Sequence, residues 1–340
     1  MTPFSRRPAD PNVSPAVMFG RLAQLAQSLR MTVISRSWDG GELNMGAREE
    51  FEAAEQKLLA EFGLDYKVNW VEVPSLGIKA RILEVGEGEP LVFVHGGAAF
   101  AASWAQLMAR LKHRRLLAVD RPGFGLTPYV DHHRGLRQMA KAFLDDVLDG
   151  LGLDRADFVV NSMGGLWAFW FSLDEPDRVA SMAQLGSPAL VEGTMPPFPM
   201  RLLSVPGLNR VVYRLPSPPV LELMGEDPAK APRALTQAFE AARKMPDFEP
   251  AWLSLLEVCL RVGGIRVGFN TEDLARVQTP TLLIWGNRDP FGGLQVARLV
   301  AAALPHCRLV ELPEEGHLPW VGDPDRCATE IEAFLSAPVS

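Results

Sequence analysis

The chain has 340 residues, of which 47% are hydrophobic and 22% charged, and its formal net charge is −7. This composition is typical of a globular protein with a sizeable core, and the negative charge gives no electrostatic reason to expect a nucleic-acid partner. No apolar run reaches the length of a membrane span, and residues 8–11 hold two prolines and an aspartate where a signal peptide needs an apolar core. Three widely spaced cysteines without a CxxC motif favour reduced thiols. We therefore expect a cytoplasmic protein without stable membrane insertion.

Residues 1–66 are predicted to form an N-terminal helical extension. Apolar residues recur at helical spacing around 15–31 and again over 47–62, where Gly63 ends the pattern. We expect these helices to pack on the main domain or on a partner subunit, so a homo-oligomer could form through them.

From residue 67 the pattern changes to predicted strands that alternate with helices, which indicates an α/β fold with a mostly parallel, doubly wound sheet. An antiparallel hairpin comes first, and we expect a β-bulge at Trp70-Val71 because the apolar positions change face there. The later predicted strands lie at 91–94, 116–119, 158–160, 179–185, 281–285 and 308–312. Residues 67–187 and 278–340 together form the predicted core.

Residues 188–277 interrupt this alternation. Nine prolines lie between Pro196 and Pro232, and helical segments follow to about residue 262. An insertion between two halves of one sheet is predicted to lie as a lid over the carboxyl ends of the strands, where ligands bind in such sheets.

A strand that turns into a helix within two residues draws attention to Ser162. The apolar run Phe158–Val160 stops at Asn161-Ser162, and a helical pattern begins after Gly164 and Gly165. Such a turn forces a strained backbone and presents the serine hydroxyl at a helix N-terminus, whose N–H groups can receive an anion. A serine becomes a nucleophile only when a base takes its proton and a third group orients that base.

Later in the chain, an aspartate and a histidine can supply the orienting acid and the base. Asp289 follows the predicted strand 281–285, and His317 follows the next predicted strand. All three side chains lie just past the carboxyl ends of strands, so we predict a catalytic triad of Ser162, Asp289 and His317. Asp289 taken alone could equally cap a turn. The remaining central and C-terminal histidines fall in polar loops or helix ends, and we expect them on the surface, with neither a metal site nor a cofactor: His113, His132, His133 and His306.

The run from Val160 to Gly164 resembles the nucleophile elbow of the α/β-hydrolases, although Val160 stands where that family usually has glycine. The order serine, aspartate, histidine is also the order that this family uses. His95-Gly96-Gly97 resembles the family's oxyanion segment, and Asp120–Gly125 resembles a family loop for which a structural role is expected. The resemblance implies an oxyanion hole formed by the N–H groups of Gly97, or Ala98, and Met163.

The resemblance implies a serine hydrolase that cleaves carboxylic esters through an acyl-enzyme intermediate. The predicted lid, residues 188–277, is rich in apolar side chains, which suggests that the substrate is an ester of a hydrophobic small molecule. Candidate substrate contacts are Ala98, Trp252 and Leu318. One alternative is a C–C hydrolase of the meta-cleavage-product type, whose elbow resembles Asn161–Gly165. Those enzymes have a tryptophan directly after the catalytic histidine, where this chain has Leu318. A second alternative is a hydrolase-like small-molecule receptor whose lid signals to a partner.

Overall fold

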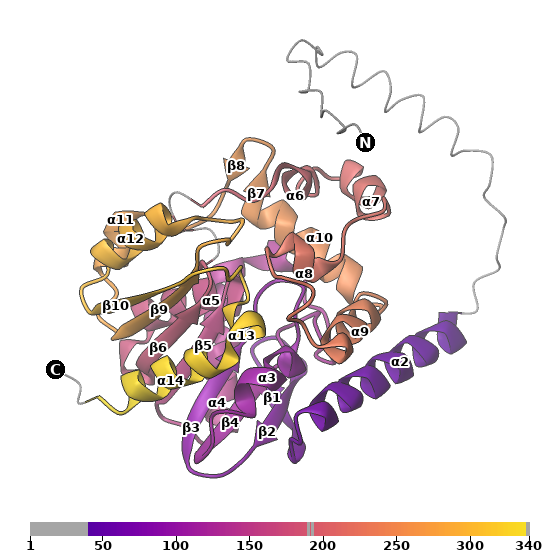
Figure 1. Ribbon diagram of the computed structural model, residues 1–340. Helices are drawn as coiled ribbons and strands as arrows, with labels where there is room; N and C mark the ends of the chain where they lie inside the picture. Colours follow the sequence, from indigo (N-terminus) through magenta and orange to yellow (C-terminus); the bar gives the residue numbers. More distant parts are fainter. Residues whose placement is uncertain (1–39, 189–190, 192–193, 338–340) are drawn as a thin grey trace, which may run out of the picture. The chain divides into compact units, whose positions relative to one another are not determined.

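The computed structural model describes residues 40–188, 191 and 194–337 (Figure 1). An eight-stranded sheet runs through it in the order β1-β2-β4-β3-β5-β6-β9-β10. The pairs β1–β2 and β2–β4 are antiparallel and all other neighbours are parallel, which confirms the predicted mostly parallel sheet. The strands are β1 (Tyr66–Val73), β2 (Ile78–Val85), β3 (Glu89–Val94), β4 (Arg114–Val119), β5 (Ala156–Asn161), β6 (Val179–Leu185), β9 (Thr281–Gly286) and β10 (Cys307–Leu312).

The bulge expected at Trp70-Val71 is wrong. Pairing between β1 and β2 is continuous from Tyr66 opposite Val85 to the other end of the hairpin. Val68 and Trp70 are instead 43% and 44% exposed on this edge strand. The apolar pattern changes face because these two side chains stand in solvent, without any inserted residue.

Helices cover both faces of the sheet, and each face has its own apolar cluster. One cluster contains Phe143 and Trp167, and the other contains Phe51 and Ile331. In α4 the buried residues recur at intervals of three and four, so one stripe of the helix faces the sheet. The helices of the core are α2 (Gly40–Glu61), α3 (Ala105–Met108), α4 (Leu136–Gly150), α5 (Met163–Asp174), α12 (Leu294–Ala303), α13 (Pro319–Gly322) and α14 (Pro324–Leu335).

The segment between β6 and β9, called the insertion below, is mainly helical. Its first helices are short because prolines lack the N–H that would continue a helical hydrogen-bond ladder. It contains α6 (Phe198–Leu202), α7 (Leu208–Tyr213), α8 (Val220–Leu223), α9 (Arg233–Ala242), α10 (Phe248–Cys259), the hairpin strands β7 (Leu260–Arg261) and β8 (Gly264–Ile265), and α11 (Thr271–Ala275).

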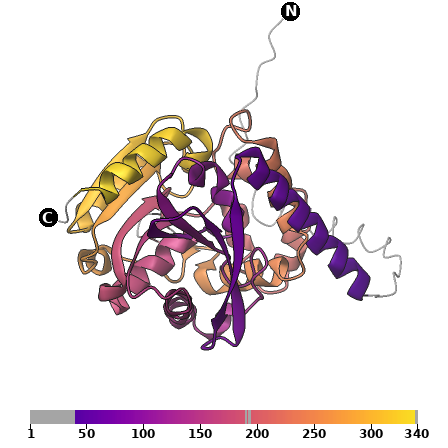
Figure 2. The ribbon, with the colours of Figure 1, turned by 90° about the horizontal axis from the view of Figure 1, so that it is seen from below.

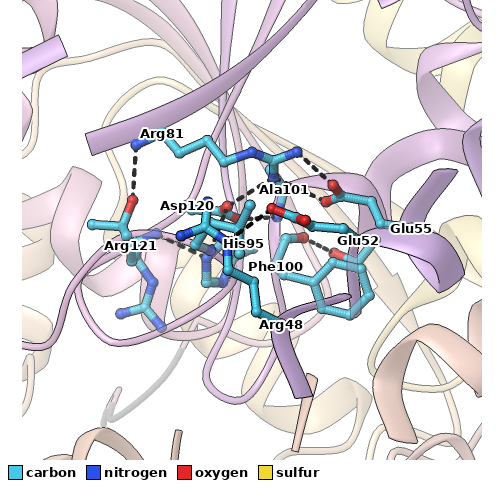
Figure 3. Close-up of polar contacts among 12 residues, drawn as sticks. Arg48, Glu52, Glu55, Arg81, His95, Phe100, Ala101, Asp120 and Arg121 are labelled. Atoms are coloured by element: carbon cyan, nitrogen blue, oxygen red, sulfur yellow. Dashed lines mark hydrogen bonds and ion pairs between the residues drawn. The ribbon is translucent and has the colours of Figure 1, made fainter. Parts of the chain in front are cut away.

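The helix expected over 47–62 forms as α2, and the one expected around 15–31 lies outside the described residues. Figure 2 shows α2 lying along one side of the molecule, where Lys57 and Glu50 hydrogen-bond to side chains of α9. Figure 3 shows how Arg81 of β2 joins Glu55 of α2 to Asp120, which follows β4. These three charged side chains are buried, so removing one would leave another charge unpaired in the interior.

In the part of the chain that the structure describes, no helix is both long and apolar enough to cross a membrane.

Candidate active site

Ser162 occupies the turn between β5 and α5 in a strained backbone conformation. Its φ of 51° and ψ of −116° lie in a region that residues with a side chain rarely adopt. The N-terminus of α5 lies so close to β3 that a Cβ on Gly164 would be 2.1 Å from the carbonyl oxygen of Val94. A Cβ on Gly165 would meet the side chain of Gln184 in β6. The fully buried Val160 does not prevent this close approach, since the tight contacts are made at the two glycines.

Asp289 and His317, from the loops after β9 and β10, are in direct contact. Nδ1 of His317 lies 2.8 Å from Oδ2 of Asp289, and the two residues are 2% and 5% exposed. The N–H groups of Ser187 and Phe291 also donate to the Asp289 carboxylate, at 2.8 and 2.9 Å. Burial alone raises the pKa of this carboxyl group. The charge of His317 and these hydrogen bonds outweigh burial, so the pKa of Asp289 lies below its ordinary value.

Asn161 holds the Ser162 turn beside the loop that carries His317. Its side-chain amide donates to the carbonyl oxygens of Leu185 and His317, at 2.7 and 3.0 Å. Ser162 and His317 both lie in the described part of the chain, and no hydrogen bond joins the Ser162 hydroxyl to His317. Catalytic hydrogen bonds of free enzymes are often long and tighten only when substrate binds.

The peptide between Gly96 and Gly97 lies beside the candidate nucleophile. A Cβ on Gly96 would be 3.0 Å from the Cβ of Ser162. The N–H groups of Gly97 and Met163 donate to no other described residue, so both can be offered to a bound oxyanion. This arrangement is compatible with the expected oxyanion hole.

Arg121, for which the sequence suggested only a structural role, fixes this peptide from behind. One guanidinium N–H of Arg121 donates to the carbonyl oxygen of Gly96 at 2.8 Å, and Nδ1 of His95 donates to the same oxygen at 2.7 Å. His95 accepts the Arg121 backbone N–H at Nε2, at 3.0 Å, which fixes its proton on Nδ1. In a trans peptide the C=O and N–H point in opposite directions, so these bonds aim the Gly97 N–H away from Arg121.

The Arg121 guanidinium is fully buried and has no carboxylate partner among the described residues. It lies 4.9 Å from the ring centre of Trp167 and 5.3 Å from that of Phe124, and such rings attract cations. Burial lowers the pKa of Arg121 to about 9, so the group remains protonated at neutral pH. A buried positive charge is thus placed one peptide away from a candidate oxyanion donor.

Replacing Arg121 with methionine is expected to lower kcat for an ester by about 10–100-fold, with KM changed less than about threefold. Deleting an oxyanion donor typically costs ~10²–10³ in rate, and misaligning one should cost less. Arg121→Lys retains the charge and should recover part of kcat. Steady-state kinetics and thermal unfolding check this prediction. A folded Arg121→Met enzyme with unchanged kcat would contradict it.

Two of the three expected substrate contacts lie at the site. A Cβ on Gly97 would be 2.6 Å from the indole of Trp252, so α10 of the insertion packs against the oxyanion segment. Ala98 is half-buried beside it, with a positive φ of 58°. Leu318 is 5% exposed, and its side chain belongs to the apolar cluster that contains Phe51. The structure therefore places Leu318 in the core.

The insertion also holds the His317 loop directly, which the sequence did not indicate. The His317 N–H donates to the carbonyl oxygen of Met224 at 2.8 Å, and the Leu318 N–H donates to the carboxylate of Glu226. Burial raises the pKa of Glu226 to about 7. These contacts join positions about ninety residues apart, and neither Met224 nor Glu226 stands in a motif that would have marked it.

The surface position expected for His132 is wrong. Its side chain is fully buried, and Nδ1 lies 2.8 Å from the hydroxyl of Ser254 in α10. Burial lowers the pKa of His132 to about 3, so this imidazole is neutral at physiological pH. The loop is polar in sequence, but α10 packs over it. The other three histidines, His113, His133 and His306, are exposed as expected.

Within the described ranges, no group of three or more histidine, cysteine, aspartate or glutamate side chains is arranged to hold a metal ion. Cys259, Cys307 and Cys327 are free thiols, and burial raises the pKa of each.

The chain is similar to known hydrolases over most of its length. It is 30% identical to a 2-hydroxy-6-oxo-2,4-heptadienoate hydrolase of Pseudomonas putida over 255 residues, which cover 72% of this chain and 87% of that protein. It is 27% identical to a pimeloyl-[acyl-carrier protein] methyl ester esterase of Serratia marcescens, covering 74% and 96% of the two chains. The crystal structure of the carboxylesterase CesB (YbfK) from Bacillus subtilis superposes with a TM-score of 0.70 at 20% identity, covering 86% and 100%.

The similarity to the carboxylesterase establishes the fold alone, because identity is low. Family membership rests on the sequence. Residues 91–330, which include the Ser162 turn and the Asp289–His317 pair, match the alpha/beta hydrolase family. The chain therefore belongs to the alpha/beta hydrolase family and is a hydrolase of that fold.

Proposed function

We propose that the protein hydrolyses carboxylic esters of hydrophobic small molecules through an acyl-enzyme on Ser162. The observation that carries this proposal is the buried Asp289–His317 pair, held beside the strained Ser162 turn by Asn161. The Asp289 carboxylate accepts a hydrogen bond from the Nδ1–H group of His317, which leaves Nε2 of the histidine as the base. A serine with such a base and such an orienting acid is suited to acyl transfer.

In the proposed reaction, Ser162 attacks the ester carbonyl while His317 takes the hydroxyl proton. The N–H groups of Gly97 and Met163 stabilise the negative charge that develops on the carbonyl oxygen. His317 then returns the proton to the departing alcohol. Water activated by the same histidine attacks the acyl-enzyme and releases the acid and the free serine.

We further propose that the insertion acts as a lid over this site. Trp252 contacts the oxyanion segment after β3, and Met224 and Glu226 contact the loop after β10. The insertion thus contacts loops at the carboxyl ends of two strands, where ligands bind in such sheets. An indole beside the oxyanion segment favours an apolar acyl or alcohol group.

A second candidate is hydrolysis of a C–C bond in a meta-cleavage product, which relatives such as the Pseudomonas putida hydrolase favour. A 2-hydroxy-6-oxo-6-phenylhexa-2,4-dienoate hydrolase of Comamonas testosteroni, 26% identical, points the same way. Against this candidate, Leu318 stands directly after His317. Trp320 is buried in a stack on Trp104, with ring centres 4.1 Å apart, and therefore does not take the place of the missing tryptophan.

A substrate panel separates the two candidates. We expect turnover of short to medium p-nitrophenyl esters and little turnover of a 6-oxo-2-hydroxydienoate. Cleavage of the dienoate is measured by the loss of its absorbance. A fluorophosphonate probe should label Ser162, as read by peptide mass spectrometry. Faster cleavage of the dienoate would favour the C–C hydrolase. A single covalent event with slow recovery would favour a receptor, and labelling of another residue would refute the assignment of Ser162.

A further inference from the structure

Two segments of the insertion carry arginines but no acidic residue. Residues 194–221 contain three arginines and residues 258–271 contain two, without a single aspartate or glutamate. The whole chain has 41 acidic residues in 340, so about five would be expected in segments of this combined length. In a chain of net charge −7, these two segments thus carry a net charge of +5, because acidic residues are missing from them.

The two segments are neighbours in space, and together we call their outer side the arginine face. Figure 1 shows α6, α7 and the β7–β8 hairpin grouped at one edge of the insertion. Arg201 of α6 donates to the carbonyl oxygen of Val262, in the hairpin turn, at 2.9 Å. A Cβ on Gly264 would touch the side chain of Met195 at 3.6 Å. The helix α6 also contacts both α7 and β7, so these elements lie side by side.

The arginine face also holds most of the exposed large apolar side chains. Ten such residues are exposed in the described parts of the chain, and six of them lie in these two segments. Single exposed apolar residues are ordinary, whereas a group of them on one surface marks an interaction site. They are Met195 (51%), Phe198 (46%), Leu208 (42%), Val211 (54%), Leu215 (46%) and Val262 (44%).

The arginines are mostly unpaired. Arg214 forms a 3.8 Å ion pair with Glu249 of α10, and Arg201 lies over the ring of Phe198. Arg210, Arg261 and Arg266 are exposed and have no carboxylate partner among the described residues. Glu257 lies at the edge of the face but is paired with His133 and hydrogen-bonded to Asn209. The surface therefore has an excess of positive charge.

From this arrangement we propose that the arginine face docks the protein on an anionic lipid surface. Apolar side chains enter the boundary between headgroups and acyl chains, and the surrounding arginines bind the phosphates. Guanidinium groups suit this role because their planar donors match phosphate oxygens. The protein lies on such a surface without crossing it. A second copy of this chain bound face to face would set arginines against arginines. A strongly acidic protein surface would pair with the arginines but would offer no apolar layer for the side chains between them.

Co-sedimentation of the full chain with vesicles tests the proposal without depending on catalytic activity. We expect binding to phosphatidylcholine vesicles that contain phosphatidylglycerol, and much weaker binding to pure phosphatidylcholine. Binding to the anionic vesicles should weaken as ionic strength rises, because salt screens exposed charges. Failure of the chain to sediment with phosphatidylglycerol vesicles at low salt would overturn the proposal.

Variants show whether this face is responsible. Each arginine near an anionic surface contributes about fivefold in partitioning, so reversing Arg210→Glu and Arg261→Glu together should weaken binding by about 25-fold or more. Phe198→Ser with Val211→Ser should weaken binding while its salt dependence remains. The matched control, Arg155→Glu with Leu299→Ser, changes an exposed arginine and an exposed leucine elsewhere and should bind normally.

Thermal unfolding verifies that each variant is folded. Two further results would overturn the proposal. One is unchanged vesicle binding by the folded arginine-face variants, or an equal loss in the control. The other is a dimer in sedimentation velocity that the same variants dissociate, with no vesicle binding by the wild type, which would assign the face to a second copy of the chain.

Discussion

Replacing Ser162 with alanine is expected to lower kcat for a p-nitrophenyl ester by about 10⁴–10⁶-fold. The variant retains the Asp289–His317 pair and the Gly97 and Met163 N–H groups, but it has no oxygen to attack the carbonyl. Fluorophosphonate labelling should disappear at the same time. Serine and alanine both have a Cβ and experience the same backbone strain at this position, so the thermal stability of the variant should change little. Initial rates with the wild type and the variant at equal concentration measure the effect.

Ser187→Ala is the matched control for this experiment. Its hydroxyl lies 3.3 Å from Nδ1 of His317, so Ser187 is a second serine close to the histidine. It stands on the side that faces Asp289, so it is not placed to pass a proton to Nε2. The bond from its backbone N–H to Asp289 survives the substitution. We expect less than about a tenfold loss in kcat. A larger loss in Ser187→Ala than in Ser162→Ala would reverse the assignment of the nucleophile.

The sheet could be predicted because each of its central strands is buried on both faces. Such strands are continuous apolar runs, as at Leu91–Val94, and turn residues bound them. The edge hairpin was predicted less well. On an edge strand Val68 and Trp70 can remain in solvent, so apolar residues no longer show which face is buried.

The candidate triad could be predicted because each member follows a strand at the same edge of the sheet. The groups that position it could not, because they act across long sequence separations. Glu226 reaches Leu318 over 92 residues, and Asn161 reaches the carbonyl oxygen of His317 over 156 residues. Arg121 stood in a recognised loop, but its direction toward Gly96 depends on how β3 and β4 pair. Periodicity describes one element at a time and carries no information on such contacts.

Replacing Asp289 with asparagine is expected to lower kcat for the same ester by about 10⁴-fold near pH 7. The Asp289 carboxylate accepts three hydrogen bonds, from His317 Nδ1 and from the N–H groups of Ser187 and Phe291. An asparagine amide directed at His317 would donate, so the histidine would carry its proton on Nε2. In that tautomer Nε2 has no lone pair to take the proton from Ser162.

Glu226→Gln is the control, because Glu226 is another buried carboxyl group near His317. The glutamine oxygen can still accept the Leu318 N–H, so the His317 loop should remain in place. We expect less than about a fivefold change in kcat. Burial raises the pKa of Glu226 to about 7, so the folded state holds the protonated carboxyl group more tightly than the unfolded state does. The free energy of unfolding of the wild type should therefore fall as pH rises from about 4.5 to 7. Glu226→Gln should lose that part of the pH dependence. If Glu226→Gln abolished activity while Asp289→Asn retained it, Glu226 would be the acid that orients His317.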